Sequence, residues 1–283
     1  MSGWDAWIGR EQRAADRIDP ALAERFHATF DLPAPSDGIL PQGFHFCLCT
    51  PTAPTAQLGR DGHPARDDSA ASFLPPFPMP RRMWASSEIT FHSPLAIGAS
   101  IVRNSRVASI AEKDGSSGRL AFVEITHETH ADGALAVSEV QTLVYREAAA
   151  PDAPLAPAEP GDGRFDKNGW DAHRALTPSP ALLFRYSALT FNTHRIHYDA
   201  PYARGEERYR GLVVHGPLTA SLLLGLAARE IGDNTLSQFS FRGMSPAIAG
   251  EVLHLAIRRD GDEITLGAFA SDGRQVMKAT AAI

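Results

Sequence analysis

The sequence predicts an α+β fold made of two tandem modules, each with a curled antiparallel sheet around a helix. Three observations lead to this prediction: a linker between halves of similar size, a weak internal repeat, and a buried helix followed by strands. A chain of 283 residues can form one large domain or two ordinary ones, and either can bury a core. The three observations favour two.

The linker occupies residues 147–163, EAAAPDAPLAPAEPGDG, where Pro, Ala and Gly dominate. It separates a predicted N-terminal module, residues 1–146, from a predicted C-terminal module, residues 164–283. The similar sizes of the two modules prompt a comparison of their sequences for internal duplication.

The repeat joins residues 89–98, ITFHSPLAIG, to residues 239–250, FSFRGMSPAIAG. Each copy runs into alternating apolar segments, and an Asp-Gly pair separates the last two segments at residues 132–133 and 272–273. Alternation around Asp-Gly is typical of a β-hairpin. Each half is therefore expected to end in a three-stranded antiparallel meander.

The clearest helix lies at residues 215–230, HGPLTASLLLGLAARE, which are apolar on nearly every face. Such a helix must be enclosed by protein, and Pro217 fits its first turn. The first half has no equally good helix, and its Pro-rich stretch at residues 58–84 is expected to be a loop. A buried helix followed by a curling sheet is the outline of a hotdog unit, so we predict a double hotdog.

The net charge and the apolar segments of the sequence argue against nucleic-acid and membrane partners. A net charge of -6 argues against nucleic acid, which needs a basic face, although a few arginines can still hold a small anion. The longest apolar stretch, near residues 218–228, is too short to cross a bilayer. The first residues lack a signal-peptide pattern. We therefore expect no membrane partner and a cytoplasmic location.

Cys47 and Cys49 are the two cysteines. Their spacing is poor for a disulfide, and two ligands are too few for a closed zinc site. We expect them to be small core residues in a reducing compartment, and we expect no metal site.

The densest polar cluster is TFNTHRIHYD at residues 190–199. One histidine alone is usually structural, but Asn, Arg and two His together beside a buried helix favour a functional site. The next segment, GLVVHGP at residues 211–217, leads into the helix. Unpaired N–H groups at a helix start can stabilise a developing oxyanion, although this segment alone is explained by an ordinary turn and helix start.

These motifs resemble a known family. YSALTFNTHRIHYD and GLVVHGPLTASLL are similar to the hydratase motif of MaoC-like enoyl-CoA hydratases, in the subgroup of the mitochondrial type 2 hydroxyacyl-thioester dehydratases and the bacterial mesaconyl-CoA and itaconyl-CoA hydratases. In the first half, DGHP, FLPP and PRRMW resemble the N-terminal module of the bacterial proteins. The resemblance covers nearly the whole chain. It implies a double hotdog with a catalytic C-terminal module and a largely non-catalytic N-terminal module.

The family pattern has an Asp five residues before its catalytic His. His197 matches that His, but the Asp position falls on Asn192, and His194 stands where the family often has Asn. Asn can orient water but cannot remove its proton. The family's Asp/His roles therefore cannot be copied directly. We assign His197 as the principal acid/base, Asn192 as a water-orienting partner, His194 as a candidate second proton carrier, and backbone N–H groups near Gly216 as donors to the enolate oxygen. Asp199 is expected to be structural.

The implied substrate is an acyl-CoA thioester, with CoA as part of the substrate and with no separate cofactor. Arg204, Arg208 and Arg210 are candidates for its phosphates, although a solvated charged loop explains them equally well. Arg81 and Arg82 could bind a carboxylate on a dicarboxylic acyl group, or form a salt bridge between modules. The candidate substrate-binding residues are Arg195, His215, Arg81, Arg82, Arg204 and Arg210.

The predicted function is the reversible addition of water across the double bond of an enoyl-CoA, with mesaconyl-CoA as an example of a C4-dicarboxyl substrate. Two alternatives stay open at this point: an acyl-CoA thioesterase, because one fold hosts many activities, and a non-catalytic acyl-CoA-binding module. A homodimer is also left open.

Overall fold

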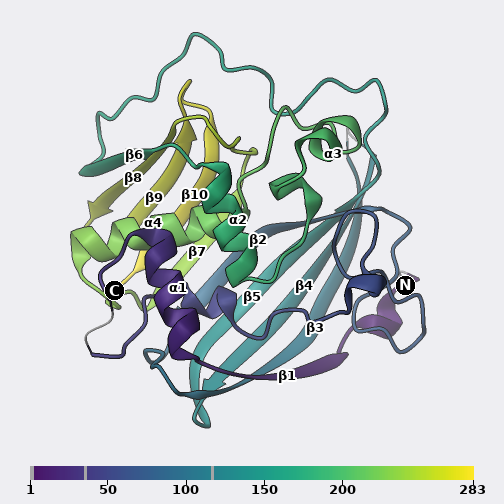
Figure 1. The fold of residues 1–283 in the computed structure, drawn as a ribbon, viewed down its shortest axis with the longest axis horizontal. Helices are drawn as coiled ribbons and strands as arrows, with labels where there is room; N and C mark the ends of the chain where they lie inside the picture. The colour runs from purple at the N-terminus through teal and green to yellow at the C-terminus, as the bar shows by residue number, and fades with distance from the viewer. Residues whose placement is uncertain (1–2, 35–36, 116–117) are drawn as a thin grey trace.

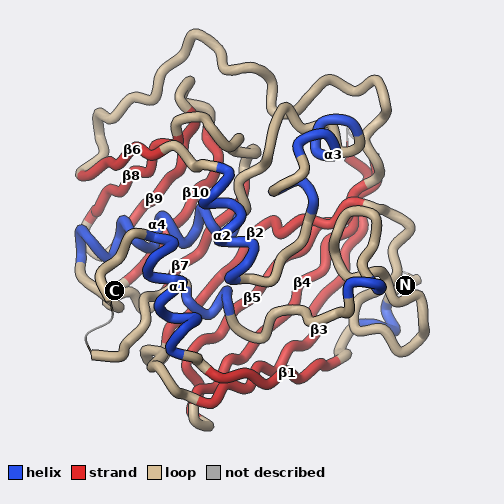
Figure 2. The backbone as a smooth tube through the Cα atoms, in the orientation of Figure 1, coloured by secondary structure: helices blue, strands red, loops and turns tan. Residues whose placement is uncertain are grey.

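The computed structural model describes residues 3–34, 37–115 and 118–283. Within these residues one sheet of ten strands runs in the order β1-β3-β4-β5-β2-β7-β10-β9-β8-β6. Its two edge strands, β1 and β6, lie far apart, and helices lie across one face (Figures 1 and 2). The strands are β1 (Glu11–Arg17), β2 (Arg81–Phe91), β3 (Ser100–Gly115), β4 (Gly118–Ala131), β5 (Ala134–Arg146), β6 (Ala172–Leu176), β7 (Gln238–Gly243), β8 (Leu253–Asp260), β9 (Glu263–Ala270) and β10 (Gln275–Ala282).

Three of the four described α-helices lie in the second half of the chain. The α-helices are α1 (Pro20–Phe30), α2 (Pro180–Leu189), α3 (Ala200–Gly205) and α4 (Gly216–Ile231), and the short 3-10 helices are η1 (Asp5–Trp7), η2 (Phe44–Cys47), η3 (Thr55–Gln57) and η4 (Arg195–His197). Figure 1 shows α1, α2 and α4 grouped over the sheet.

The two halves repeat one topology. In the first half β1 pairs with β3, β3 with β4, β4 with β5 and β5 with β2, and the second half repeats this sequence with β6, β8, β9, β10 and β7. The halves join where β2 pairs antiparallel with β7, with Ile89 opposite Phe239. These are the first residues of the two sequence repeats, so the repeat marks the same strand in each half. The predicted α+β double hotdog is confirmed.

The local predictions also hold. The Asp-Gly pairs connect β4 to β5 and β9 to β10, and Asp132 and Gly133 adopt φ values of 49° and 87°. Helix α4 begins at Gly216 and has Pro217 in its first turn. The first half does contain a helix, α1, whose start is capped by Asp19 through the N–H groups of residues 21 and 22. Helix α1 has only a narrow stripe of buried apolar residues, so its apolar sequence pattern is weaker than that of α4.

Helix α4 serves as the core of both halves. Between α1 and β2, the described residues of the first half form only short 3-10 helices, where the second half has α4. Gly43, with φ of 98°, approaches so closely that a Cβ there would lie 3.0 Å from a methyl carbon of Leu224 on α4. One core cluster therefore contains residues of both halves. Because this core spans the predicted boundaries at residues 146 and 164, the division into domains stays a prediction.

The Pro-rich stretch forms a long loop up to residue 80 and packs on the first half of the sheet. The expected loop at residues 81–84 is wrong, because after the last proline these residues pair with β5 as the start of β2. Phe77 and Met79 are buried against a second core cluster that includes Val107 and Tyr145. Arg66 donates hydrogen bonds to the carbonyls of Phe77 and Met79. These contacts fix the chain just before β2 begins at residue 81.

Two smaller expectations can be compared with the structure. Cys47 and Cys49 are both free thiols and both buried, as expected for core residues. Among the helices that the model describes, none has the length and apolar character needed to span a membrane.

We predict that residues 164–283 do not fold alone, because truncation would expose the paired edge of β7 and the face of α4 that the first half covers. Strand edges left unpaired promote association with other chains. When this segment is expressed, it should be insoluble, or soluble but unfolded as measured by circular dichroism. The full chain should be soluble and folded under the same conditions. A soluble, folded monomer of residues 164–283 would contradict the prediction.

Candidate active site

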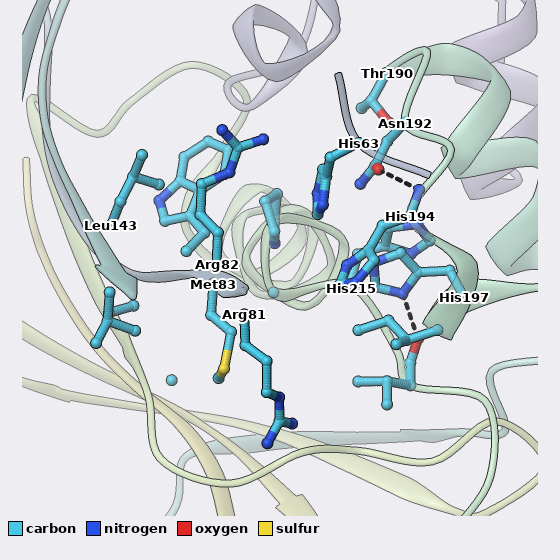
Figure 3. A pocket seen from close by; sticks show the side chains of 18 of the residues that line it. His63, Arg81, Arg82, Met83, Leu143, Thr190, Asn192, His194, His197 and His215 are labelled. Atoms are coloured by element: carbon cyan, nitrogen blue, oxygen red, sulfur yellow. Dashed lines mark hydrogen bonds between the residues drawn. The ribbon is translucent and has the colours of Figure 1, made fainter. Parts of the chain in front are cut away.

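A cavity of about 1240 Å³ opens where the two halves meet. It is lined by the Pro-rich loop, the start of β2, the segment after α2 and the start of α4. Figure 3 shows His194, His197 and His215 on one side of it and Arg82 and Leu143 on the other. The volume exceeds what an ordinary small-molecule site needs, so a large ligand can enter.

The segment after α2 turns sharply before it reaches the histidines. Phe191 adopts a left-handed φ of 48°, and the Asn192 side-chain oxygen accepts a hydrogen bond of 2.9 Å from the His194 N–H. The short helix η4 then follows, anchored by a small apolar cluster that includes Ile196 and Val213. Asn192 thus shapes the backbone that presents His197 and lines the cavity itself.

His197 is held as a neutral base. Its Nδ1 donates to the Val213 carbonyl over 2.7 Å, so Nε2 keeps a free lone pair. Its ring stacks on His215 with centroids 3.5 Å apart. Burial, the neighbouring His215 and then His194 hold the pKa of His197 well below its ordinary value. The ring can therefore accept a hydrogen bond or a proton at Nε2.

His215 caps the start of α4 at the cavity wall. Its Nε2 lies 2.9 Å from the Ser187 hydroxyl, and burial lowers its pKa to about 3. Gly216 is the first residue of α4 and also lines the cavity. The first N–H groups of a helix have no partner within it and carry partial positive charge. This end of α4 can therefore stabilise negative charge.

His194 belongs to a buried ion-pair chain that crosses the two halves. Its Nε2 donates to one Glu207 oxygen over 3.1 Å, and Arg81 donates from Nε to the other oxygen, also over 3.1 Å. Burial acts to raise the pKa of Glu207, but the hydrogen bond and charge of His194 and the charge of Arg81 outweigh it and lower that pKa. Nothing in the sequence marks Glu207, because the Arg81 that completes its set of partners lies 126 residues away in the chain.

The first half brings a second carboxylate and histidine to the same place. His63 lies 2.9 Å from Asp61 through Nδ1, and its ring centroid is 4.1 Å from that of His194. Donor atoms of Asp61, His63 and His194 lie within 4.8 Å of one another, a spacing that could hold a metal ion. Each of these side chains already has a protein partner, and the expectation of no metal stays a prediction.

The predicted arginines separate into two groups. Arg81, Arg82 and Arg208 line the cavity. Arg208 donates from Nε to the Ala153 carbonyl over 2.8 Å, whereas the Arg82 guanidinium has no hydrogen bond or salt bridge to any residue in the described part of the chain. Figure 3 shows Arg82 facing the histidines while Arg81 points away.

The other three predicted arginines do not line the cavity. Arg195 pairs with Asp199 at 2.7 Å, and Asp199 also caps α3, which is the structural role expected for it. Arg210 is buried and pairs with Glu251. Arg204 lies on the exposed side of α3. None of the three therefore belongs to the cavity wall, and their role in substrate binding stays a prediction.

A family model agrees with this site. The model for hydroxyacyl-thioester dehydratase type 2 matches residues 43–249, a span that includes every residue of the site named above. The chain belongs to this family. The resemblance seen in the sequence motifs is thereby confirmed.

Relatives of this dehydratase family member support the assignment. A mesaconyl-C(4)-CoA hydratase of Chloroflexus aurantiacus is 43% identical over 98% of this chain and 96% of its own length. A mitochondrial hydroxyacyl-thioester dehydratase type 2 of Schizosaccharomyces pombe is 28% identical over 82% of each chain. The chain is therefore an enzyme of the hydratase and dehydratase type, a hydro-lyase, rather than a thioesterase or a non-catalytic module.

Solved structures confirm the fold. A MaoC-like dehydratase has a TM-score of 0.74 at 15% identity over 99% of both chains. A conserved protein of Mycobacterium tuberculosis described as having a double hotdog fold has a TM-score of 0.60 at 15% identity, over 97% of this chain and 95% of its own. At these identities the likeness concerns the fold alone.

We predict that the folded state of this dehydratase loses stability at acid pH because of its buried histidines. Burial lowers the pKa of His45 and His215 to about 3 and that of His63 and His127 to about 4. Below about pH 6.5 the unfolded chain protonates these rings while the folded chain does not, so each removes about 1.4 kcal/mol of stability per pH unit until its folded pKa is reached. Glu139, whose pKa burial raises to about 7, opposes this, because the folded chain binds its proton more readily.

The expected result is a fall in the thermal unfolding midpoint between pH 7 and pH 5, measured by circular dichroism. The variant His45→Gln removes one such ring and should show a shallower fall. A midpoint that is constant over this range in the wild-type protein would contradict the prediction.

Proposed function

We propose that this chain adds water reversibly across the carbon–carbon double bond of an enoyl-CoA thioester, with His197 as the principal acid/base. The observation that carries this proposal is the free Nε2 of His197 in a cavity that also contains the start of α4. A base and an oxyanion site in one cavity are what hydration of an enoyl thioester needs. The names of the two relatives support the same chemistry.

The proposed steps use these groups in turn. The Nε2 of His197 takes a proton from water as the water oxygen attacks the β-carbon. The electron pair of the double bond moves to the thioester oxygen, where the N–H of Gly216 and the positive end of α4 stabilise it. The α-carbon then takes the proton back from His197. Asn192 donates from its amide nitrogen to the water and so orients it.

His194 keeps its proposed role as a second proton carrier, with Glu207 behind it. Glu207 receives hydrogen bonds from both His194 and Arg81, so Nε2 of His194 carries a proton. No cofactor other than the CoA of the substrate enters these steps. Location in the cytoplasm and assembly as a homodimer stay predictions.

Arg82 is the proposed determinant of acyl-group specificity. Its guanidinium faces the histidines across the cavity (Figure 3) and lacks a carboxylate partner in the described part of the chain. Guanidinium binds carboxylate through two parallel hydrogen bonds. We therefore infer an acyl group that ends in a carboxylate, such as that of mesaconyl-CoA. Arg81 has Glu207 as its partner and has a structural role instead.

We predict that the purified protein hydrates an enoyl-CoA, measured as loss of the absorbance of the conjugated thioester with mesaconyl-CoA and crotonyl-CoA. The variant His197→Ala should lower kcat by about 10²–10⁴-fold, because a positioned acid/base group is lost. His92→Ala is a matched control, because His92 is exposed and bonds only the Ser138 hydroxyl. Wild-type kcat in His197→Ala would refute the role of His197, and hydrolysis of saturated acyl-CoA without hydration would refute the function.

A second prediction concerns the terminal carboxylate of the proposed acyl group and its pairing with Arg82. Leaving a guanidinium unpaired in a partly dry pocket costs about 1–3 kcal/mol, and 1.4 kcal/mol corresponds to about tenfold. Mesaconyl-CoA should therefore exceed crotonyl-CoA by about tenfold or more in kcat/KM, and Arg82→Met should remove this preference. Arg81→Met should lower kcat/KM for both substrates alike. Equal kcat/KM for both substrates in the wild type, or a preference retained in Arg82→Met, would rule out the carboxylate role.

A further inference from the structure

The sequence motif DGHP, at residues 61–64, has no role in the steps above, yet it reaches the centre of the site. Gly62, His63 and Pro64 line the cavity beside the second-half histidines, and Figure 3 shows His63 between Arg82 and His194. The His63 side chain is 20% exposed, whereas that of His194 is 7% exposed. His63 is therefore the more accessible of these two rings to a ligand in the cavity.

The position of His63 is fixed by contacts across the two halves. The Asp61 carbonyl accepts a hydrogen bond of 2.8 Å from the Arg195 N–H, and the Thr193 hydroxyl donates to the Gly62 carbonyl. Gly62 has a φ of 89°, and a Cβ there would fall 1.9 Å from the Thr193 carbonyl oxygen. Only glycine permits this approach, so the loop is shaped to dock against the turn that carries Asn192 and His194.

Asp61 sets the chemical state of the His63 ring. Because a carboxylate only accepts hydrogen bonds, Nδ1 of His63 carries the proton and Nε2 keeps the lone pair. Burial and the charge of Arg82 lower the pKa of His63 to about 4, although the hydrogen bond that Nδ1 donates to Asp61 acts to raise it. The ring is therefore neutral near pH 7, with an accepting Nε2 of the same kind as that of His197.

The two carboxylates of the site, Glu207 and Asp61, differ in the groups that they accept hydrogen bonds from. Glu207 is shared between His194 and the permanent charge of Arg81. Asp61 bonds the ring and backbone N–H of His63; burial would raise its pKa, but the contacts with His63 outweigh burial and lower it to about 2. The Asp61 carboxylate therefore hydrogen-bonds one imidazole, that of His63, which lies against the cavity.

We propose that His63 is a second catalytic histidine and that Asp61 positions it, the His63 ring supplying a second hydrogen-bond acceptor for the attacking water, beside an Asn192 amide whose oxygen already accepts from the His194 N–H. This inference rests on the proposed hydration. One O–H of the water donates to His197 Nε2, and the other donates to His63 Nε2. As the oxygen bonds the β-carbon, the first O–H breaks and its proton moves to His197, which returns it to the α-carbon. The second O–H stays intact in the product hydroxyl, which still donates to His63.

The test compares full-length variants with mesaconyl-CoA and crotonyl-CoA as substrates. His63→Ala should lower kcat by about 10²-fold, within the range for loss of one positioned catalytic group, with KM within about threefold. His63→Gln, which keeps an acceptor, should retain more of kcat than His63→Ala. Asp61→Asn should fall between wild type and His63→Ala, because Asn can bond either tautomer of the ring.

Arg60→Ala is the matched control for loop docking. Arg60 lies in the same loop and pairs with Glu206 of the second half at 2.7 Å, with 77% of its side chain exposed. Its loss removes a contact between the halves without touching the cavity, so kcat and the unfolding midpoint should stay at wild-type values. A drop in kcat of equal size in Arg60→Ala and His63→Ala would overturn the proposal in favour of a docking role.

The remaining outcomes separate this proposal from the function on which it rests. If His63→Ala retains kcat within about threefold while His197→Ala is inactive, the role of His63 is refuted and the hydratase stands. If the wild-type protein hydrates neither substrate, both are refuted. If His63→Ala fails to fold, His63→Gln and Asp61→Asn decide, and wild-type kcat in both would overturn the proposal.

Discussion

The antiparallel pairing of β2 with β7 is the constraint on which the rest of the structure depends. It turns two five-stranded sheets into one and places Arg81 and Arg82, at the start of β2, opposite the loops of the second half. It also lets the first half cover α4, whose apolar surface would otherwise face water. The cavity exists because the Pro-rich loop and the segment after α2 meet above this seam.

Local signals in the sequence were sufficient for much of the fold. The apolar run of α4, the Asp-Gly turns and the repeat at β2 and β7 are patterns over a few residues, and all are confirmed. The residues between 190 and 217 were found because Asn, His and Arg gather there. Contacts between distant segments could not be predicted from local patterns. Glu207 and His63 reach the site through tertiary packing, whereas Arg195 and Arg210 form ion pairs with Asp199 and Glu251 outside the cavity lining.

The electrostatics of the site follow from its position between two packed halves. Burial keeps the rings of His63, His197 and His215 neutral near pH 7, because a charged imidazole without water is costly. The two carboxylates, Asp61 and Glu207, enter from opposite halves and bond different rings. Neutral rings with accepting nitrogens suit proton transfer to and from water at a pH near 7.

The short 3-10 helices that stand in the first half in place of α4 have a consequence for stoichiometry. A chain built by duplication of one hotdog unit would, with two equal halves, present two helix starts and could bind two acyl groups. Here, among the described residues, the first half has no counterpart of α4, and it contributes His63, Arg81 and Arg82 to a cavity completed by the second half. If the proposed function holds, each polypeptide therefore binds one thioester, and the first half forms part of the wall of that single site.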